Sequence, residues 1–288
     1  MIDFTKLPTK KKSYGGKDGP KFSVERNGEL WMLKLARPVK TSAGAFRGTS
    51  PLSEYLGCRI FSMLGEDAQE TLLGTYSHRE ETFLAVACKD FEGNGYRFLD
   101  FASVLNGMID ASKDKPMELA NVLRAIRIQA LVHKETLSHR FWNMFVIDAF
   151  LANPSRSHKD WGFLYNQKTD EARIAPIFDC GSCLFPQNDE AAAEEILSDP
   201  ARIRARIYDF PTSSLQENGK RINYYSFLRS HKYPECDRAL KRIKERVDLS
   251  KIDALIDDVE CLGGSYKRFL KTILRKRFEA YFLCDTLR

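Results

Sequence analysis

A long apolar segment, a polar loop and a hairpin follow one another in the middle of this 288-residue chain. Residues 137–152, which contain FWNMFVIDAFL, are so apolar that they predict a largely buried helix. The polar loop 153–160 leads from this helix into WGFLYN and ARIAPIFD, two strand-like runs joined by a polar turn. Because loops held on a rigid scaffold often carry functional side chains, this loop is the first candidate site.

The first third of the chain predicts a small sheet with one helix. KFSVERN and ELWMLKLA are strand-like runs that meet at Asn27-Gly28, a dipeptide typical of a type I′ hairpin. Ser50 is expected to cap the following helix, with Pro51 at its first position and Gly65 at its end. TLLGTYS and TFLAVAC then read as a second pair of strands.

From Tyr96 onward the hydrophobic pattern becomes helical apart from the WGFLYN hairpin, and the chain beyond about residue 190 reads as helices and loops. A small sheet with one helix, a connector near 89–96 and a larger helical part predict an α+β protein with two lobes. We expect the first lobe to cover residues 1–92, and the second, which carries the polar loop and its hairpin, to cover 93–288.

The charge of the chain does not indicate nucleic-acid binding. The net charge is +6, from 45 basic and 39 acidic residues, which is a mild excess. Basic residues gather in KRFLKTILRKRF, 267–278, where Phe269, Ile273 and Phe278 share an apolar helical face and residues such as Lys271 point outward. No aromatic residue interleaves the basic face, so the pattern favours a helix packed on the protein body over an RNA- or membrane-binding helix.

Targeting and membrane signals are absent from the sequence. No stretch approaches the ~20 apolar residues of a membrane span, and MIDFTKLPTKKKSYGG has no apolar core of a secretory signal. The seven cysteines are scattered through apolar segments such as LAVACKD, which is typical of thiols buried in a reducing compartment. We therefore expect a cytoplasmic protein.

Two features of the predicted sheet suggest a site. YGGKDGPK, 14–21, is a Gly-rich turn whose backbone could approach a phosphate, although it matches neither common phosphate-loop pattern and an ordinary turn is the alternative. Lys34 is a lone lysine in an apolar strand, and an inward-facing Lys34 needs an anionic partner. Glu54 could be that partner or only a carboxylate in the first turn of a helix, and Lys34 could instead point outward from an edge strand.

Two carboxylates lie at the ends of the predicted hairpin. Asp160 precedes it and Asp179 ends it, so the hairpin could bring both to one Mg²⁺, which prefers oxygen ligands. The adjacent CGSC, Cys180 to Cys183, has the CxxC spacing of redox and zinc sites. There is no second CxxC or Cys/His pair, so zinc or disulfide chemistry is disfavoured, and a redox protein is kept only as a third hypothesis.

The order of these parts is that of a protein kinase, and the chain resembles the HipA-like kinases nearly end to end. The resemblance is carried by YGGKDG, the Lys34 strand, LSEYLGCRI, QETLLGTY, VACKDF, FWNMFVIDAFLAN, WGFL, IAPIFDCGSCL and RINYYSFL. It implies a compact two-lobed kinase fold, with a small β-rich N-lobe that holds one helix and a larger helical C-lobe. It also implies ATP- and Mg²⁺-dependent phosphorylation of protein serine or threonine.

The resemblance also implies roles for individual residues. Lys34 would hold the α- and β-phosphates of ATP, Glu54 would orient Lys34, and Asp179 would bind Mg²⁺. The expected nucleotide-binding residues further include the glycines of the turn and three residues of the adenine hinge: Gly15, Gly16, Gly19, Ala87, Cys88 and Lys89.

The polar loop departs from the family pattern N-x-D-R-H-x-x-N-W-G. The family's catalytic Asp falls on Ser155, its His on Ser157 and its metal-binding Asn on Asp160, whereas Arg156 is kept. A serine cannot act as a carboxylate base, so His158 is considered as a substitute base, and Asp160 as a metal ligand. Reading His158-Lys159-Asp160 as the HRD motif of other kinases is rejected, because the Asn expected five positions later is Tyr165.

Two functions remain open on this sequence. One is a kinase, slow and autophosphorylating, with Thr41, Ser42, Thr49 and Ser50 as candidate sites. The other is a pseudokinase, which binds nucleotide and acts through contacts with a partner. The resemblance implies a protein substrate or the chain itself as phosphate acceptor, and an antitoxin or host protein as a partner; we expect neither a membrane nor direct nucleic-acid binding.

Overall fold

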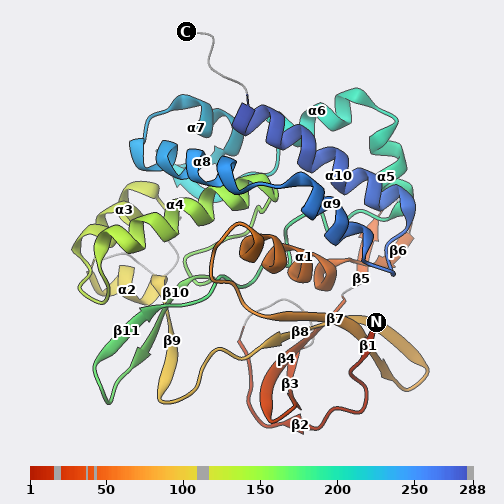
Figure 1. Cartoon of the computed structure of the whole chain (residues 1–288), viewed down its shortest axis with the longest axis horizontal. Coiled ribbons are helices and arrows are strands. Elements are labelled where there is room, and N and C mark those ends of the chain that lie inside the picture. The colour runs from red at the N-terminus through yellow and green to blue at the C-terminus, as the bar shows by residue number, and fades with distance from the viewer. Residues whose placement is uncertain (16–20, 37, 42–43, 109–116, 284–288) are drawn as a thin grey trace.

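The computed structural model describes residues 1–15, 21–36, 38–41, 44–108 and 117–283. A six-stranded sheet occupies one part of the molecule and a set of helices the other, with a smaller three-stranded sheet beside them (Figure 1). The predicted α+β class and the sheet-rich first part are therefore confirmed.

The six-stranded sheet has the strand order β1-β7-β8-β4-β3-β2, and its neighbours are antiparallel except for the parallel pair β1 and β7. Its strands are β1 (Ile2–Asp3), β2 (Thr9–Lys10), β3 (Lys21–Arg26), β4 (Glu29–Leu35), β7 (Thr71–His78) and β8 (Glu81–Lys89). A separate ribbon pairs β5 (Pro38–Thr41) with β6 (Gly44–Arg47). The β3–β4 turn has φ of 53° at Asn27 and 77° at Gly28, as the type I′ prediction requires.

The helix α1 (Ser50–Met63) connects the two parts of the molecule. Its expected cap was wrong by one residue, because Thr49 is the N-cap and Ser50 already belongs to the helix. The Thr49 hydroxyl makes no cap bond; it lies 3.3 Å from the Pro186 carbonyl oxygen and 3.1 Å from the Tyr266 hydroxyl. Gly65 follows the helix with φ of +81°, as predicted.

The apolar side chains of α1 belong to the large core of the helical part. Leu52, Leu56 and Phe61 are buried in the same cluster as Phe141 and Phe145 of α4 (Lys134–Phe150). The core of the six-stranded sheet is a separate, smaller cluster around Trp31. The sheet and the helical part are thus joined through α1, and the exact boundary between the two lobes stays a prediction.

The three-stranded sheet has the order β11-β10-β9, with β9 (Tyr96–Asp100), β10 (Gly162–Asn166) and β11 (Glu171–Ile174). The predicted hairpin is β10–β11, but the expectation that the chain turns helical at Tyr96 was wrong, because β9 pairs along the whole of β10. Gly162 permits this pairing: a Cβ there would lie 2.3 Å from the Leu99 carbonyl oxygen.

The remaining helices pack against α4 or against one another (Figure 1). They are α2 (Phe101–Met108), α3 (Leu119–Ile128), α5 (Glu190–Leu197), α6 (Pro200–Tyr208), α7 (Tyr224–Ser230), α8 (Pro234–Arg246), α9 (Leu249–Asp257), α10 (Gly264–Phe278) and the π-helical turn η1 (Glu279–Leu283). A hairpin of β12 (Thr212–Glu217) and β13 (Lys220–Asn223) was not predicted in this region. Within the described ranges, no helix combines the length and apolar character needed to cross a bilayer.

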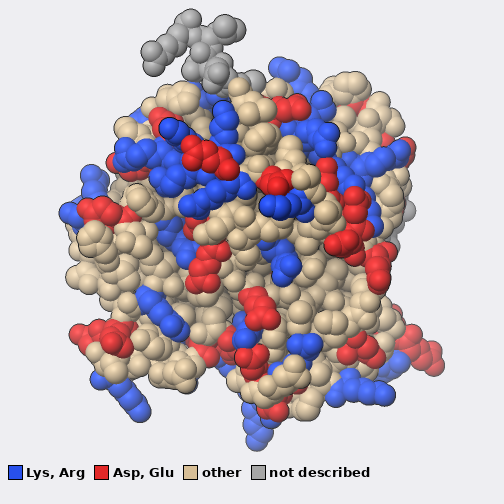
Figure 2. All heavy atoms as spheres, in the orientation of Figure 1, with Lys and Arg blue, Asp and Glu red and all other residues tan. Residues whose placement is uncertain are grey.

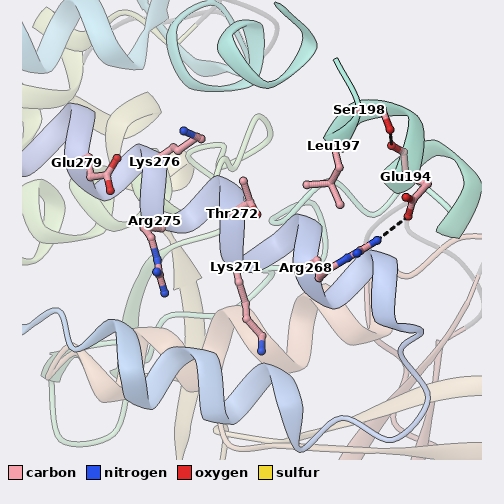
Figure 3. A pocket seen from close by; sticks show the side chains of 9 residues that line it. All are labelled: Glu194, Leu197, Ser198, Arg268, Lys271, Thr272, Arg275, Lys276 and Glu279. Atoms are coloured by element: carbon pink, nitrogen blue, oxygen red, sulfur yellow. Dashed lines mark hydrogen bonds and ion pairs between the residues drawn. The ribbon is translucent and has the colours of Figure 1, made fainter. Parts of the chain in front are cut away.

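The basic helix α10 packs on the body of the protein, as predicted. Phe269 and Ile273 are buried, whereas Arg277, which was not expected inside, is also buried and donates to the Ala149 carbonyl oxygen. A hollow of about 560 Å³ lies between α10 and α5 (Figure 3). Three of the four basic side chains along it are paired with carboxylates: Arg268 with Glu194, Lys271 with Asp257 and Arg275 with Asp253.

Charged side chains of both signs are mixed over the face in view (Figure 2). The same mixing holds at α10, where the pairing carboxylates come from α5 and α9. Such pairing offsets part of the positive charge of α10.

Candidate active site

A cleft of about 1110 Å³ lies between the six-stranded sheet and the helical part. One wall comes from β3, β4 and the start of α1, and the other from the loop 153–160 and the segment after β11. The cleft is lined by five of the residues singled out in the sequence for their chemistry: Lys34, Glu54, Ser155, Asp160 and Asp179.

Lys34 faces inward and has anionic partners, so the alternative that it points outward from an edge strand was wrong. Its Nζ lies 2.8 Å from Glu54 Oε2 and 3.1 Å from Asp179 Oδ1, and the residue is only 7% exposed. Burial opposes the charged form of Lys34, but the Glu54 and Asp179 carboxylates outweigh it and hold the pKa well above its usual value. Lys34 is therefore a fixed ammonium group at the wall of the cleft.

Glu54 connects Lys34 to the backbone beside Asp179. Its Oε2 accepts from Lys34, and its Oε1 accepts from the Cys180 backbone N–H at 3.0 Å. Gly181 leaves room for this contact, because a Cβ there would lie 3.2 Å from Glu54 Oε2 and 2.9 Å from Ser50 Oγ. Glu54 thus fixes both the lysine and the turn that presents Asp179.

Asp160 and Asp179 face the same cleft from the two ends of the β10–β11 hairpin. Burial and the neighbouring charge of Asp179 raise the pKa of Asp160, although its Oδ2 accepts from the Ser157 N–H at 2.7 Å. For Asp179, burial raises the pKa, but the charge of Lys34 outweighs that effect and lowers it. The charge of Asp179 thus acts on Asp160 across the cleft, and a divalent cation bound to both carboxylates would neutralise them.

The donor set is suited to Mg²⁺ rather than to zinc. Among the described residues, no group of three or more His, Cys, Asp and Glu side chains could hold a metal. Mg²⁺ is commonly bound through one or two carboxylates and completes its octahedron with substrate phosphates and water. Asp160 and Asp179 fit that pattern, because each keeps an oxygen that does not accept the bonds from Ser157 or Lys34.

Ser155 occupies the exposed centre of the loop. Its backbone N–H and its hydroxyl both lie close to Asn153 Oδ1, at 3.1 and 3.2 Å. Asn153 is in turn held by Asp148, since Asn153 Nδ2 donates to Asp148 Oδ1 at 2.8 Å. The hydroxyl at position 155 therefore lies at the cleft beside an amide oxygen and not beside a carboxylate.

His158 does not line the cleft, unlike its neighbours Ser157 and Lys159. Its carbonyl oxygen accepts from the Ala102 N–H, and its Nδ1 is buried with no hydrogen-bond partner in the described part of the chain. Burial lowers the pKa of His158, which favours the neutral ring. The substitute base considered from the sequence is thus placed behind the loop and not at the cleft.

Arg156 supports the loop from inside. It is buried, forms an ion pair with Asp148 with 2.9 Å between Nε and Oδ2, and donates to the Phe178 carbonyl oxygen. Asp148 was not singled out in the sequence, although a lone carboxylate within the apolar run FWNMFVIDAFL was the available signal. Arg156 therefore joins the loop to the residue that precedes Asp179.

The three residues expected at the adenine hinge lie next to the cleft rather than on it. Ala87 and Cys88 are buried in β8, and Lys89 pairs with Glu29 and Glu70 outside the cleft. The cleft wall is made instead by the residues that follow, Asp90, Phe91 and Glu92.

The segment before the Gly-rich turn contacts this wall. Tyr14 Oη donates to Asp90 Oδ2 at 2.8 Å, and Lys12 Nζ lies 2.5 Å from Asp90 and 2.7 Å from Glu92. These contacts join residues more than 70 positions apart, and no sequence signal pointed to them. Gly15 lines the cleft, whereas Gly16 and Gly19 lie outside the described residues.

The CGSC segment is a turn whose two cysteines are buried, whereas Gly181 and Ser182 line the cleft. The Cys183 N–H donates to the Cys180 carbonyl oxygen at 3.0 Å, and both thiols are buried and free. All six cysteines of the described part of the chain are free.

The candidate phosphorylation sites are placed differently. Ser50 lines the cleft, and Thr49 contacts Pro186 and Tyr266. Ser42 and the Thr41 side chain lie outside the described residues.

The chain resembles a kinase of one bacterial species along most of its length. The serine/threonine-protein kinase CtkA of Helicobacter pylori strain J99 is 42% identical over 279 residues, which are 96% of this chain and 85% of the relative. The crystal structure of a Helicobacter pylori proinflammatory kinase CtkA has a TM-score of 0.89 at 40% identity and covers 98% of this chain and 95% of that chain.

A more distant likeness concerns the fold alone. HipA of Shewanella oneidensis MR-1, solved with HipB and operator DNA, has a TM-score of 0.54 at 13% identity, over 95% of this chain and 65% of that chain. No family model matches the chain. The kinase-like two-lobed fold and the resemblance to HipA-like kinases, both expected from the sequence, are confirmed by these likenesses. With 42% identity over nearly its whole length, the chain belongs to the family of the serine/threonine-protein kinase CtkA.

Proposed function

We propose that this chain transfers the γ-phosphoryl group of MgATP to serine or threonine hydroxyls, slowly, because its loop has no carboxylate base at position 155. The observation that carries the proposal is the position of Lys34, held between Glu54 and Asp179 on the wall of a cleft that Asp160 also lines. The kinase identity of the relative supports the reaction class.

The residues of the cleft have separate roles in this proposal. Lys34 binds the phosphate oxygens, and Glu54 keeps its ammonium group in place. Asp160 and Asp179 would hold Mg²⁺, which when bound neutralises charge on the phosphates. Asp90, Phe91 and Glu92 form the wall for the adenine, in place of the expected Ala87 to Lys89.

The loop determines the rate. Phosphoryl transfer depends chiefly on positioning and electrostatic stabilisation, so loss of the base lowers the rate without abolishing transfer. A positioned base contributes ~10²–10⁴ in rate. Ser155 cannot supply that contribution, because a serine hydroxyl is not a base at neutral pH. His158, the substitute base suggested by the sequence, does not line the cleft.

The phosphate acceptor we propose is a protein hydroxyl. Within the chain itself the candidate is Ser50, which lines the cleft.

The second candidate function is a pseudokinase that binds MgATP without transfer. It is favoured by one observation, which is that the Ser155 hydroxyl lies beside the Asn153 amide oxygen and not beside a carboxylate. Such a protein would act through a partner. The HipA of known structure was solved with HipB and operator DNA, and an antitoxin-like protein is the partner class we propose to test.

One experiment separates the two functions. The purified chain is incubated with Mg²⁺ and γ-labelled ATP, alone and with a generic protein acceptor, beside the Asp179→Ala variant. Transfer by the wild type that Asp179→Ala abolishes supports the kinase. Thermal stabilisation by MgATP without transfer supports the pseudokinase, and a wild-type chain that does not bind MgATP contradicts both.

A further inference from the structure

Lys21, at the start of β3, lies directly opposite Lys34 of β4 in the antiparallel register. Residues paired in this way point to the same face of the sheet, with Cβ atoms about 5 Å apart, and two like charges so placed are destabilising. The face they share is the wall of the cleft, because both residues line it. The sheet thus presents two neighbouring lysines on the wall proposed for the phosphates.

The two lysines differ in what neutralises them. Lys34 has two carboxylates within 3.1 Å, those of Glu54 and Asp179. The hydrogen bond of Lys21 Nζ in the described part of the chain goes to the Gly15 carbonyl oxygen, at 3.3 Å, and no carboxylate there pairs with it. Lys12, which also lines the cleft, is paired with Asp90 and Glu92. Among the described residues of this wall, Lys21 is therefore the cation with no anionic partner.

We propose that Lys21 binds the outer phosphates of the nucleotide, as a second phosphate-binding lysine beside Lys34. This inference rests on the proposed function, since its ligand is the polyphosphate of MgATP. A phosphate bound beside Lys34 would accept a charge-assisted hydrogen bond from Lys21, which pairs with no carboxylate of the described residues. Lys21 already acts at this site electrostatically: after Lys34 and Arg156, it contributes to lowering the pKa of Asp179, against the effect of burial.

A structural role for Lys21 makes a different prediction. If its function were only to hold the Gly-rich turn through the Gly15 carbonyl, its loss would weaken every ligand of the cleft equally. If it binds the outer phosphates, its loss weakens ATP strongly and AMP, which lacks those phosphates, very little. The number of phosphates on the ligand therefore distinguishes the two roles.

The test compares Kd values of the full chain for MgATP, MgADP and AMP by calorimetry, in the wild type, Lys21→Gln and Lys21→Arg. Lys10→Gln is the matched control: Lys10 lies on the neighbouring strand, pairs with Glu25 at 2.7 Å and does not line the cleft. We expect Lys21→Gln to weaken MgATP about tenfold, which is the effect of losing one charge-assisted hydrogen bond, and to leave AMP unchanged. Lys21→Arg and Lys10→Gln should bind as the wild type does.

The unliganded proteins provide a second readout. Because the hydrogen bond of Lys21 Nζ in the described part of the chain goes to a backbone carbonyl, Lys21→Gln should leave the Tm without nucleotide close to that of the wild type, so that weaker binding cannot be ascribed to unfolding. Equal MgATP affinity in wild type and Lys21→Gln, or an equal loss for AMP and ATP, overturns the assignment of Lys21 alone. A wild type that binds no MgATP overturns the proposed function and this inference together.

Discussion

Arg156 and Asp148 form an ion pair, 2.9 Å between Nε and Oδ2, which is buried beneath the loop that carries Ser155 and Asp160. Asp148 comes from α4, and Arg156 also reaches the Phe178 carbonyl oxygen next to Asp179. One guanidinium group therefore links a core helix, the loop and the segment that presents the second carboxylate of the cleft.

The first prediction concerns this pair. Replacing Asp148 by Ala leaves the Arg156 charge buried without its partner, which should lower the free energy of unfolding by about 3–5 kcal/mol. Chemical denaturation of the wild type and the variant measures this loss in the free energy of unfolding. The double variant Asp148→Leu, Arg156→Met should lose less than the sum of the two single changes, because no unpaired charge remains. Additive losses would contradict a coupled pair.

The second prediction concerns the base that we propose is lacking at position 155. Ser155→Asp should raise the rate of phosphoryl transfer by about 10²–10⁴, because it would place a carboxylate at the position proposed for the base. Ser157→Asp is the matched control, since Ser157 lines the same cleft two positions away and should bring no gain. Single-turnover transfer from labelled ATP measures both variants. A faster transfer rate in Ser157→Asp, or an unchanged rate in Ser155→Asp, would show that position 155 is not the position of the base.

The third prediction concerns pH and the metal. Burial and the charge of Asp179 raise the pKa of Asp160, so a larger fraction of Asp160 is protonated in mildly acidic solution than of an ordinary aspartate. Mg²⁺ binds the ionised form, so Mg²⁺-dependent ATP affinity should fall as the pH falls from about 7 toward about 5. In Asp160→Asn, which cannot titrate, that decline should be smaller. Titration of MgATP at several pH values tests this, with ATP in EDTA as the metal-free reference.

The fourth prediction concerns the buried ion pair of Lys34 and Glu54. Lys34→Met leaves Glu54, which is 1% exposed, without its cation, and should destabilise the protein by about 3–5 kcal/mol as well as weaken ATP binding. The double variant Lys34→Met, Glu54→Gln should recover part of that stability while ATP binding stays weak. Thermal denaturation and ATP titration in parallel distinguish the two effects. If the double variant is as unstable as Lys34→Met, the ion pair is not the cause.

The fifth prediction concerns Gly181. A methyl group there would meet Ser50 Oγ at 2.9 Å and Glu54 Oε2 at 3.2 Å, so Gly181→Ala should displace the Lys34–Glu54 pair and cost about 1–3 kcal/mol. Gly93→Ala is the control, because nothing lies within 4 Å of a Cβ at Gly93. Equal denaturation midpoints for the two variants would contradict a steric clash between a methyl group at position 181 and the side chains of Ser50 and Glu54.

Local chemistry made some of this structure predictable from the sequence. Asn27-Gly28 indicates its hairpin because both residues tolerate positive φ, and the lone Lys34 of an apolar strand requires a partner wherever it is buried. The cap of α1 was misplaced because the Thr49 hydroxyl is engaged by Pro186 and Tyr266, which are distant in sequence. The strand β9 was missed because its pairing partner lies some 65 positions later, at β10.

The sequence also indicated several residues of the candidate site, but not the contacts around them. Lys34, Glu54, Asp160 and Asp179 each had a chemical reason to be noticed, and the structure brings these four to one cleft. The contacts of Lys12 and Tyr14 with Asp90 depend on the tertiary path of the chain, which no local pattern encodes. The position of His158 behind the loop also depends on that path, because Ala102 holds its backbone from another element.

The burial of α1 in the core of the helical part has a consequence for how the molecule unfolds. A fragment ending at residue 92 would expose the apolar face formed by Leu52, Leu56 and Phe61, and would lose the packing partners of that face on α4. The sheet should therefore not fold autonomously, and the intact chain should melt in a single cooperative transition rather than lobe by lobe. Nucleotide entry is then expected to depend on local movement at the rim of the cleft, and not on separation of two independently stable bodies.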